Sequence, residues 1–166
     1  MILGDPYKFA VCLQTIPEWN GNDTFRNGVL LFFIDGEIFP PKELTNATLS
    51  GEIVCLKERL NNIIKDSRIY ALNKEQAFSE MYEASFQTIE STASFAIEPM
   101  AFDDCNCLVF AVSNGENVRI LASQPLYSKE EAHHVMENIS IAEIYVPQKY
   151  LFDIILGLKI WLKSEK

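Results

Sequence analysis

The stretch GVLLFFIDGEIF, residues 28–39, decides the fold more than any other part of the sequence. Gly28 to Ile34 is almost wholly apolar, which predicts a strand covered on both faces. Asp35-Gly36 follows as a tight hairpin turn, because glycine tolerates the positive φ that such a turn requires. Glu37 to Phe39 then returns, and Pro40-Pro41 ends the pairing. The segment therefore predicts an antiparallel hairpin.

Apolar runs on both sides of this hairpin predict further strands. Residues Tyr7 to Ile16 alternate, which indicates a half-buried strand with one face formed by Tyr7, Phe9, Val11 and Leu13. After it, Pro17 to Asn27 is turn-rich and predicts a loop. Asn114-Gly115 predicts a turn, and the residues after it alternate as in a strand. One face of that strand is formed by Val118, Ile120 and Ala122, and the other by Arg119, Leu121 and Ser123. The other expected strands are Ser94–Ala101, with Pro99 at an edge or bulge, Cys107–Val112 and Ile139–Val146.

Three helices are expected from apolar stripes at a spacing of 3.6 residues. The first is capped by Ser50, has Glu52 in its first turn, and buries Ile53, Leu56, Leu60, Ile63 and Ile64. The second starts at Asn73, which forms a capping box with Gln76, and buries Ala77, Phe78, Met81 and Tyr82. The third opens at Pro147 and buries Leu151, Ile154, Ile155, Leu158, Trp161 and Leu162. Ser128 with Glu131 predicts a further short helical turn.

Strands cluster at the start and in the second half of the chain, and the helices do not alternate with them. This order predicts an α+β fold rather than a doubly wound one. We expect one domain over residues 1–166, with a largely antiparallel sheet of about six strands and about three helices packed against it.

Charge and composition exclude several classes of function. The chain has 166 residues, with 14 Lys and Arg against 23 Asp and Glu, so its formal net charge is −9. Such a protein repels nucleic acid and anionic membranes and attracts basic partners. The N-terminus has no secretory pattern, and the longest apolar run, Val29–Ile34, is far too short to span a membrane. The four cysteines are expected to be free thiols in the cytoplasm.

The sequence contains no pattern that predicts catalysis or cofactor binding. No phosphate-binding glycine loop, HExxH or GxSxG motif is present. A cysteine nucleophile is disfavoured because Asp103 and Asp104 would raise the pKa of the Cys105 thiol. His133 and His134, as neighbours on a helix, would point in different directions and make a poor metal site. We therefore expect no catalytic residue, no cofactor and no metal, which favours a binding protein over an enzyme.

Five segments together resemble the immunity protein 42 family of bacterial polymorphic-toxin immunity proteins, of the kind paired with contact-dependent growth-inhibition toxins. They are MILGDPYKFAV (1–11), EWN (18–20), NGVLLFFIDGEIFP (27–40), GEIVCLKERL (51–60) and EIYVPQKYLFDIILGLKIWL (143–162). The resemblance implies a cytoplasmic antitoxin that binds a cognate toxin domain. Many such toxins are nucleases with basic clefts, and an inhibitor of charge −9 suits that partner.

Toxin contacts are expected on loops and polar faces, because helix stripes and strand interiors form the core. Trp19, in a polar loop, is either a lid over the core or an exposed anchor. The candidate contact residues combine acid with an exposed setting: Glu18, Trp19, Asp23, Asp103, Asp104, Glu116, Glu130 and Glu131. Two other hypotheses stay open from the sequence, an unrelated cytoplasmic interaction or adaptor domain and a small enzyme with an unrecognised site.

Overall fold

The computed structural model describes residues 1–21, 26–42, 44, 46–87, 94–130 and 133–164. It confirms an α+β fold in which all the strand ladders are antiparallel, but the described strands number ten and lie in three sheets instead of one. The first sheet has the order β1-β2-β3-β4, with β5 also paired to β3. Its strands are β1 (Ile2–Gly4), β2 (Phe9–Thr15), β3 (Asn27–Ile34), β4 (Glu37–Phe39) and β5 (Asn46–Thr48).

The predicted hairpin, formed by β3 and β4, lies at one side of this first sheet. Strand β3 pairs with β2, with Phe9 opposite Ile34. It also pairs with β4, to which it is joined by the turn at Asp35-Gly36. Both turn residues have positive φ, 53° and 82°, as a two-residue hairpin requires. Gly28 is needed for close approach, because a Cβ there would lie 2.1 Å from the carbonyl oxygen of Gln14.

The second sheet separates two hydrophobic cores. Its order is β10-β7-β6, and its strands are β6 (Leu108–Ser113), β7 (Asn117–Ser123) and β10 (Ala142–Pro147). One face of β6 and β7, which includes Val109 and Ile120, joins the core under the first sheet, α1 and α4. The other face, which includes Phe110 and Leu121, packs against α2 and α3. The predicted alternation on β7 is confirmed, but both of its faces are buried.

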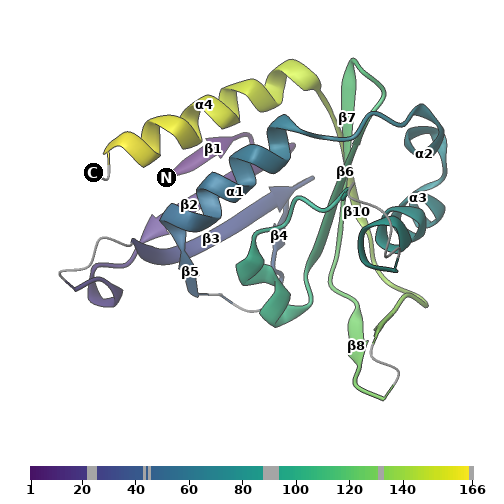
Figure 1. Cartoon of the computed structure of the whole chain (residues 1–166), viewed down its shortest axis with the longest axis horizontal. Coiled ribbons are helices and arrows are strands. Elements are labelled where there is room, and N and C mark those ends of the chain that lie inside the picture. Colours follow the sequence, from purple (N-terminus) through teal and green to yellow (C-terminus); the bar gives the residue numbers. More distant parts are fainter. Residues whose placement is uncertain (22–25, 43, 45, 88–93, 131–132, 165–166) are drawn as a thin grey trace.

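Helices cover the two sheets separately (Figure 1). Helices α1 (Leu49–Asn61) and α4 (Gln148–Ser164) lie side by side over the first sheet, and α2 (Ser67–Ala71) and α3 (Lys74–Tyr82) lie beside the second. Asn73 caps α3 as predicted, since its side chain accepts from the amide of Gln76. Shorter turns complete the helical content, namely the 3-10 helices η1 (Pro17–Trp19) and η3 (Met100–Cys105) and the π-helix η2 (Glu83–Gln87).

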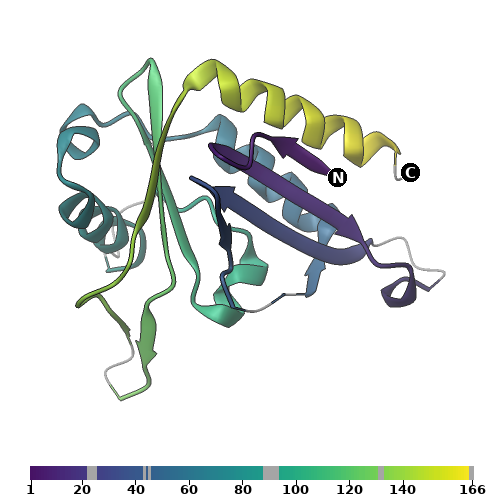
Figure 2. The same cartoon turned by 180° about the vertical axis from the view of Figure 1, so that it is seen from behind.

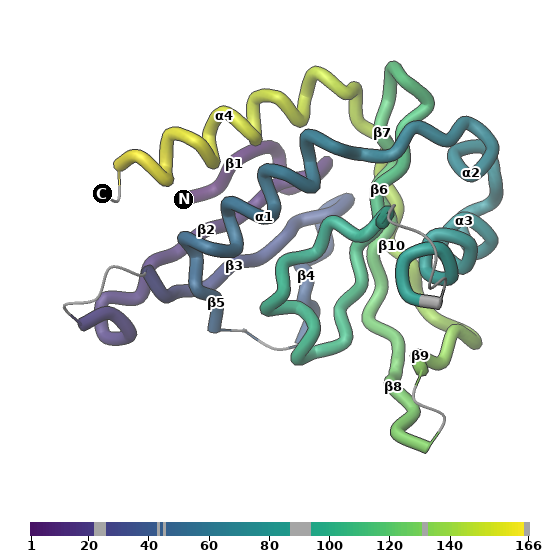
Figure 3. The backbone as a smooth tube through the Cα atoms, in the orientation of Figure 1, coloured from purple at the N-terminus to yellow at the C-terminus, as the bar shows by residue number. Residues whose placement is uncertain are grey.

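A small hairpin projects from the second sheet. It is formed by β8 (Leu126–Ser128) and β9 (His133–Val135), which pair with each other in a two-stranded sheet. The tube in Figure 3 shows both strands below the body of the molecule, away from α4. The predicted helical turn from Ser128 is therefore wrong, because Ser128 is paired with His133 in this ladder.

Several local predictions are corrected by tertiary contacts. Ser94–Ala101 is not a strand; within it only Ala96 makes an isolated bridge, to Phe110, before η3 begins. Ser50 lies inside α1 and does not cap it, and Ile63 and Ile64 lie beyond the helix end. Tyr7 does not share the buried face of β2, since it occupies the preceding turn with 81% of its surface exposed.

Candidate functional site

The predicted contact residues fall into three separate regions. Glu18 and Trp19 lie in η1, where Trp19 is 43% exposed and therefore is not a lid sealed into the core. Glu116 is exposed in the turn between β6 and β7. Asp103 and Asp104 are exposed in η3, and Glu130 is exposed in the turn after β8. Asp23 and Glu131 lie outside the described residues.

Two of these segments come together, η3 and the β8–β9 hairpin (Figure 1). The side-chain amide of Gln124, just before β8, donates to the carbonyl oxygen of Cys105 at 2.8 Å. A concavity of about 400 Å³ between them is lined by residues that include Asp104, Leu126, Tyr127 and Lys129. We call this region the hairpin surface and define it by five side chains: Asp103, Asp104, Leu126, Tyr127 and Glu130.

A buried carboxylate on α1 holds η3 in place. Glu52 is only 5% exposed, and its two oxygens accept hydrogen bonds from the backbone amides of Met100 and Ala101 at 2.9 and 3.0 Å. These amides begin η3 and would otherwise lack partners. The sequence placed Glu52 in the first turn of α1, but its hydrogen bonds show that it caps a different helix. Asp103 and Asp104 are thereby presented on a fixed turn.

A second buried carboxylate, Glu98, lies directly before η3. Its Oε2 accepts from the amide of Val109 at 3.1 Å, and Arg59 donates to its backbone carbonyl oxygen. Burial raises the pKa of Glu98 from 4.5 to about 7, although hydrogen bonds from the backbone amides of Glu98 and Val109 and the charge of Arg59 oppose the shift. Burial also raises the pKa of the partly exposed Asp103 carboxyl.

The hairpin carries apolar side chains as well as acid. Leu126 is 78% and Tyr127 44% exposed. Beneath them, the His134 ring stands edge-on to Tyr127, and its Nδ1 lies 3.2 Å from the hydroxyl of Tyr82 on α3. Both histidines lie on strand β9, where we expected a helix. Burial of the His134 ring lowers its pKa. This contact ties the hairpin to the body of the molecule.

Sequence reasoning missed a wide groove lined by aromatic residues at the other end of β10. Its volume is about 840 Å³, and it lies between the turn after β1, the end of β10 and the first turns of α4. Glu116 is at this end, because its carbonyl oxygen accepts from the amide of Gln148. We call it the aromatic groove and define it by Tyr7, Lys8, Tyr145, Lys149, Tyr150, Phe152 and Asp153. The available signal was Phe152, which lies off the buried stripe of α4.

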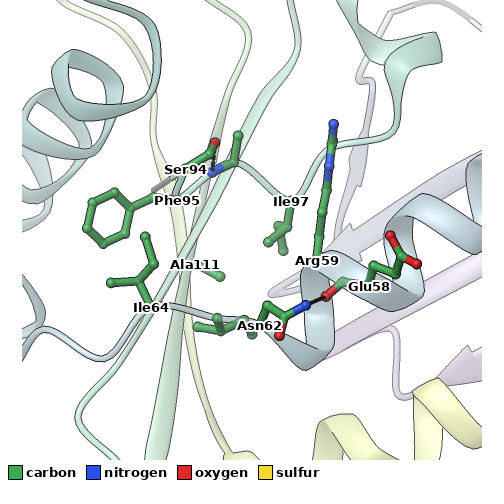
Figure 4. Close-up of a pocket in the computed structure, with 10 residues that line it drawn as sticks. Glu58, Arg59, Asn62, Ile64, Ser94, Phe95, Ile97 and Ala111 are labelled. Atoms are coloured by element: carbon green, nitrogen blue, oxygen red, sulfur yellow. Dashed lines mark hydrogen bonds between the residues drawn. The ribbon is translucent and has the colours of Figure 1, made fainter. Parts of the chain in front are cut away.

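A third concavity, of about 450 Å³, lies between α1 and residues 94–97 (Figure 4). Arg59 lies on α1 and Asn62 lies just after its last residue, and both side chains are opposite Phe95 and Ile97 across the concavity. Arg59 is engaged with the carbonyl oxygen of Glu98, and the Asn62 amide donates to the carbonyl oxygen of Glu58 at 2.9 Å. Among the described residues that line it, none is a cysteine or a histidine, and none belongs to a metal-ligand set.

Among the described residues, no group of three or more His, Cys, Asp or Glu side chains could hold a metal ion. Cys105 and Cys107 are buried, and burial raises the pKa of the Cys107 thiol, which disfavours the reactive thiolate. No helix in the described part of the chain has the length and apolar content to cross a bilayer.

Comparison with known proteins identifies the family. The profile described as immunity protein 42 matches residues 1–161. The chain belongs to the immunity protein 42 family. A search of curated protein sequences finds no match. Among solved structures, the crystal structure of CdiI from Burkholderia dolosa AUO158 is similar at 18% sequence identity, with a TM-score of 0.71, over 95% of this chain and 99% of that chain. This likeness shows that the two share a fold. Members of this family are immunity proteins, and the partner of an immunity protein is its cognate toxin.

Proposed function

We propose that this immunity protein neutralises a nuclease toxin domain in the cytoplasm, as a non-enzymatic single-domain inhibitor, by placing carboxylates in the toxin's basic cleft. The observation that carries the proposal is the charge of −9 on a member of an immunity family. A nuclease cleft is lined with cations that bind phosphates. Carboxylates can occupy the same positions and deny them to nucleic acid.

The hairpin surface is the part of the molecule that fits this role best. Asp103, Asp104 and Glu130 supply three exposed acids against two cations, Lys42 and Lys129, that line the concavity there. Leu126 and Tyr127 supply apolar area beside them. The hairpin projects from the body, so it can enter a concave site. Acid at the rim accelerates association, whereas an apolar centre slows dissociation.

Family membership argues against the adaptor hypothesis, and the buried thiols argue against the enzyme hypothesis. We expect the gene directly upstream of this one to encode a large secreted protein that carries the toxin domain. The test is to express the C-terminal domain of that protein with and without this chain. We expect growth arrest that the chain relieves, and a purified toxin domain that degrades DNA or RNA until the chain is added at equal concentration. A toxin domain that arrests growth but cleaves neither nucleic acid would contradict the nuclease assignment.

A further inference from the structure

We infer that the aromatic groove receives an apolar side chain of the same toxin domain and supplies the part of the affinity that salt does not screen. This inference rests on the proposed function, since it takes the toxin domain as the partner. It adds a second contact, of different chemistry from the hairpin surface.

The walls of the groove are fixed before any partner binds. The Tyr145 ring has the guanidinium of Arg119 at 5.5 Å from its centroid and the Tyr70 ring edge-on at 5.6 Å, and its hydroxyl donates to Glu143 at 2.9 Å. The Tyr150 hydroxyl donates to the carbonyl oxygen of Phe9 at 2.8 Å and accepts from the amide of Asp5 at 2.6 Å. Rings held in this way lose little conformational entropy when a partner binds.

Other aromatic surface at the groove is open. Tyr7 is 81% exposed and Phe152 is 56% exposed. Burying a large apolar side chain is favourable, so these exposed rings would gain free energy if a partner covered them. Tyrosine and other aromatic residues are enriched among the few residues that carry most of the energy of an interface. The groove therefore has the composition of a protein contact.

The local charge indicates what enters the groove. The Nζ of Lys8 lies 3.8 Å from Oδ2 of Asp5. Lys149 and Asp153 are one helical turn apart on α4, so the two lysines have two acids close to them. The groove is thus neutral in a protein of charge −9. A neutral aromatic groove does not match a cluster of cations, and it matches an apolar side chain presented by the partner.

One toxin domain can reach both contacts. The groove lies at the Pro147 end of β10 and the hairpin surface lies beyond the Ala142 end, where β7 leads into β8. Figure 2 shows this strand, in yellow-green, running from the hairpin to the start of α4. Strand β10 alone spans about 20 Å, and the hairpin lies beyond its end, so a toxin domain that covers both contacts makes an interface larger than the standard of about 800 Å² per partner.

The experiment uses the complex of the chain with the upstream-encoded toxin domain, made by co-expression. The groove variant carries Tyr7→Ala and Phe152→Ala, and a second variant carries Phe152→Glu alone. The matched control carries Leu156→Ala and Ile160→Ala, on the same helix with similar exposure, 55% and 59%, but outside the groove. Thermal melts verify folding, and dissociation rates are measured at low and at high salt.

We expect both groove variants to dissociate at least about tenfold faster than the wild type at both salt concentrations, and the control to match the wild type. Groove variants that dissociate like the control would overturn the inference and leave the proposed function intact. Concentration-dependent dimers of the free chain that the groove variants abolish would assign the groove to a second copy and also overturn it. A wild-type chain that does not bind the toxin domain would refute the proposed function itself.

Discussion

Arg119 and Glu143 form an ion pair between neighbouring strands, with Nη2 of the arginine 2.6 Å from Oε1 of the glutamate. Arg119 is 1% exposed, and its Nη1 also donates to the carbonyl oxygens of Tyr70 and Leu72, at 3.0 and 2.7 Å. One side chain on β7 therefore holds the edge strand β10, the end of α2 and, through its cation–π contact, Tyr145.

Replacing Arg119 should strongly destabilise the fold. Arg119→Met leaves the carbonyl oxygens of Tyr70 and Leu72 without this donor, and it leaves the Glu143 carboxylate with the Tyr145 hydroxyl alone. Removing one partner of a buried ion pair costs about 3–5 kcal/mol, and the 25% exposure of the Glu143 side chain places this loss at the lower end of that range. The free energy of unfolding, measured by urea denaturation, should fall by about that amount. Arg68→Gln is the matched control, because it breaks the exposed Arg68–Glu80 pair and should leave the midpoint unchanged. Equal midpoints for the two variants would contradict the role given to Arg119.

Glu98 should make stability fall as the pH rises. Its pKa is about 7 in the folded chain against an ordinary value of 4.5, so between these values the folded state binds more protons than the unfolded state. Linkage then gives a free energy of unfolding that decreases from pH 4.5 to 7, by at most about 3 kcal/mol from this group. Glu98→Gln removes the titration and should flatten that part of the profile. An unchanged slope in the variant would show that the Glu98 carboxyl is not protonated in this range.

Glu52 should be far more important for stability than Glu58, the exposed glutamate on the same helix. Glu52→Ala leaves the amides of Met100 and Ala101 without acceptors. A buried amide that loses its partner, here that of Ala101, costs about 1–3 kcal/mol, whereas the amide of the exposed Met100 can bind water and costs less. We expect a loss of about 2–3 kcal/mol in denaturant unfolding. Glu58→Ala, at an exposed position on the same helix, is the control and should change stability little. Equal losses in the two variants would mean that Glu52 does not cap η3.

The sequence predicted the elements that depend on local chemistry. The hairpin of residues 28–39 formed because an apolar run and an Asp-Gly turn agree on one structure. The strand predicted over Ser94–Ala101 is reduced to one bridge, between Ala96 and Phe110 of β6. Phe95 packs in the core beside α3 and Ile97 in the core under the first sheet, and the chain then turns into η3, so the pairing does not extend into a ladder. Arg119 was assigned to a face with Leu121 and Ser123 as expected, but its burial depends on carbonyl groups of α2 that no local pattern reveals.

The candidate site was predictable as a set of positions and not as a surface. Asp103, Asp104 and Glu130 are exposed, as their loop positions suggested. That η3 meets the hairpin follows from contacts such as Gln124 to Cys105, across 19 residues of sequence. The aromatic groove brings Tyr7 beside Tyr145 and Phe152 from the other end of the sequence, so a local pattern could mark Phe152 as an exposed aromatic residue but could not reveal the groove.

Charge reversal should distinguish two of the three regions that carry the predicted acids, the hairpin surface and η1. A variant with Asp103→Lys, Asp104→Lys and Glu130→Lys should lose protection of toxin-expressing cells, since like charges across an interface repel. Glu18→Lys, in η1 at a distance from the hairpin surface, should fold and protect like the wild type. The readout is growth after toxin induction, with folding verified by thermal melt. Full protection by the triple variant would exclude the hairpin surface as the toxin contact.

The central claim, that carboxylates of this immunity protein meet a basic toxin cleft, is tested most directly by the association rate at different salt concentrations. Stopped-flow mixing with the toxin domain encoded upstream should show a rate constant that falls steeply as the Debye length drops below about 10 Å. The charge-reversal variant should start slower and depend less on salt. An association rate that stays constant across the salt series would contradict the account.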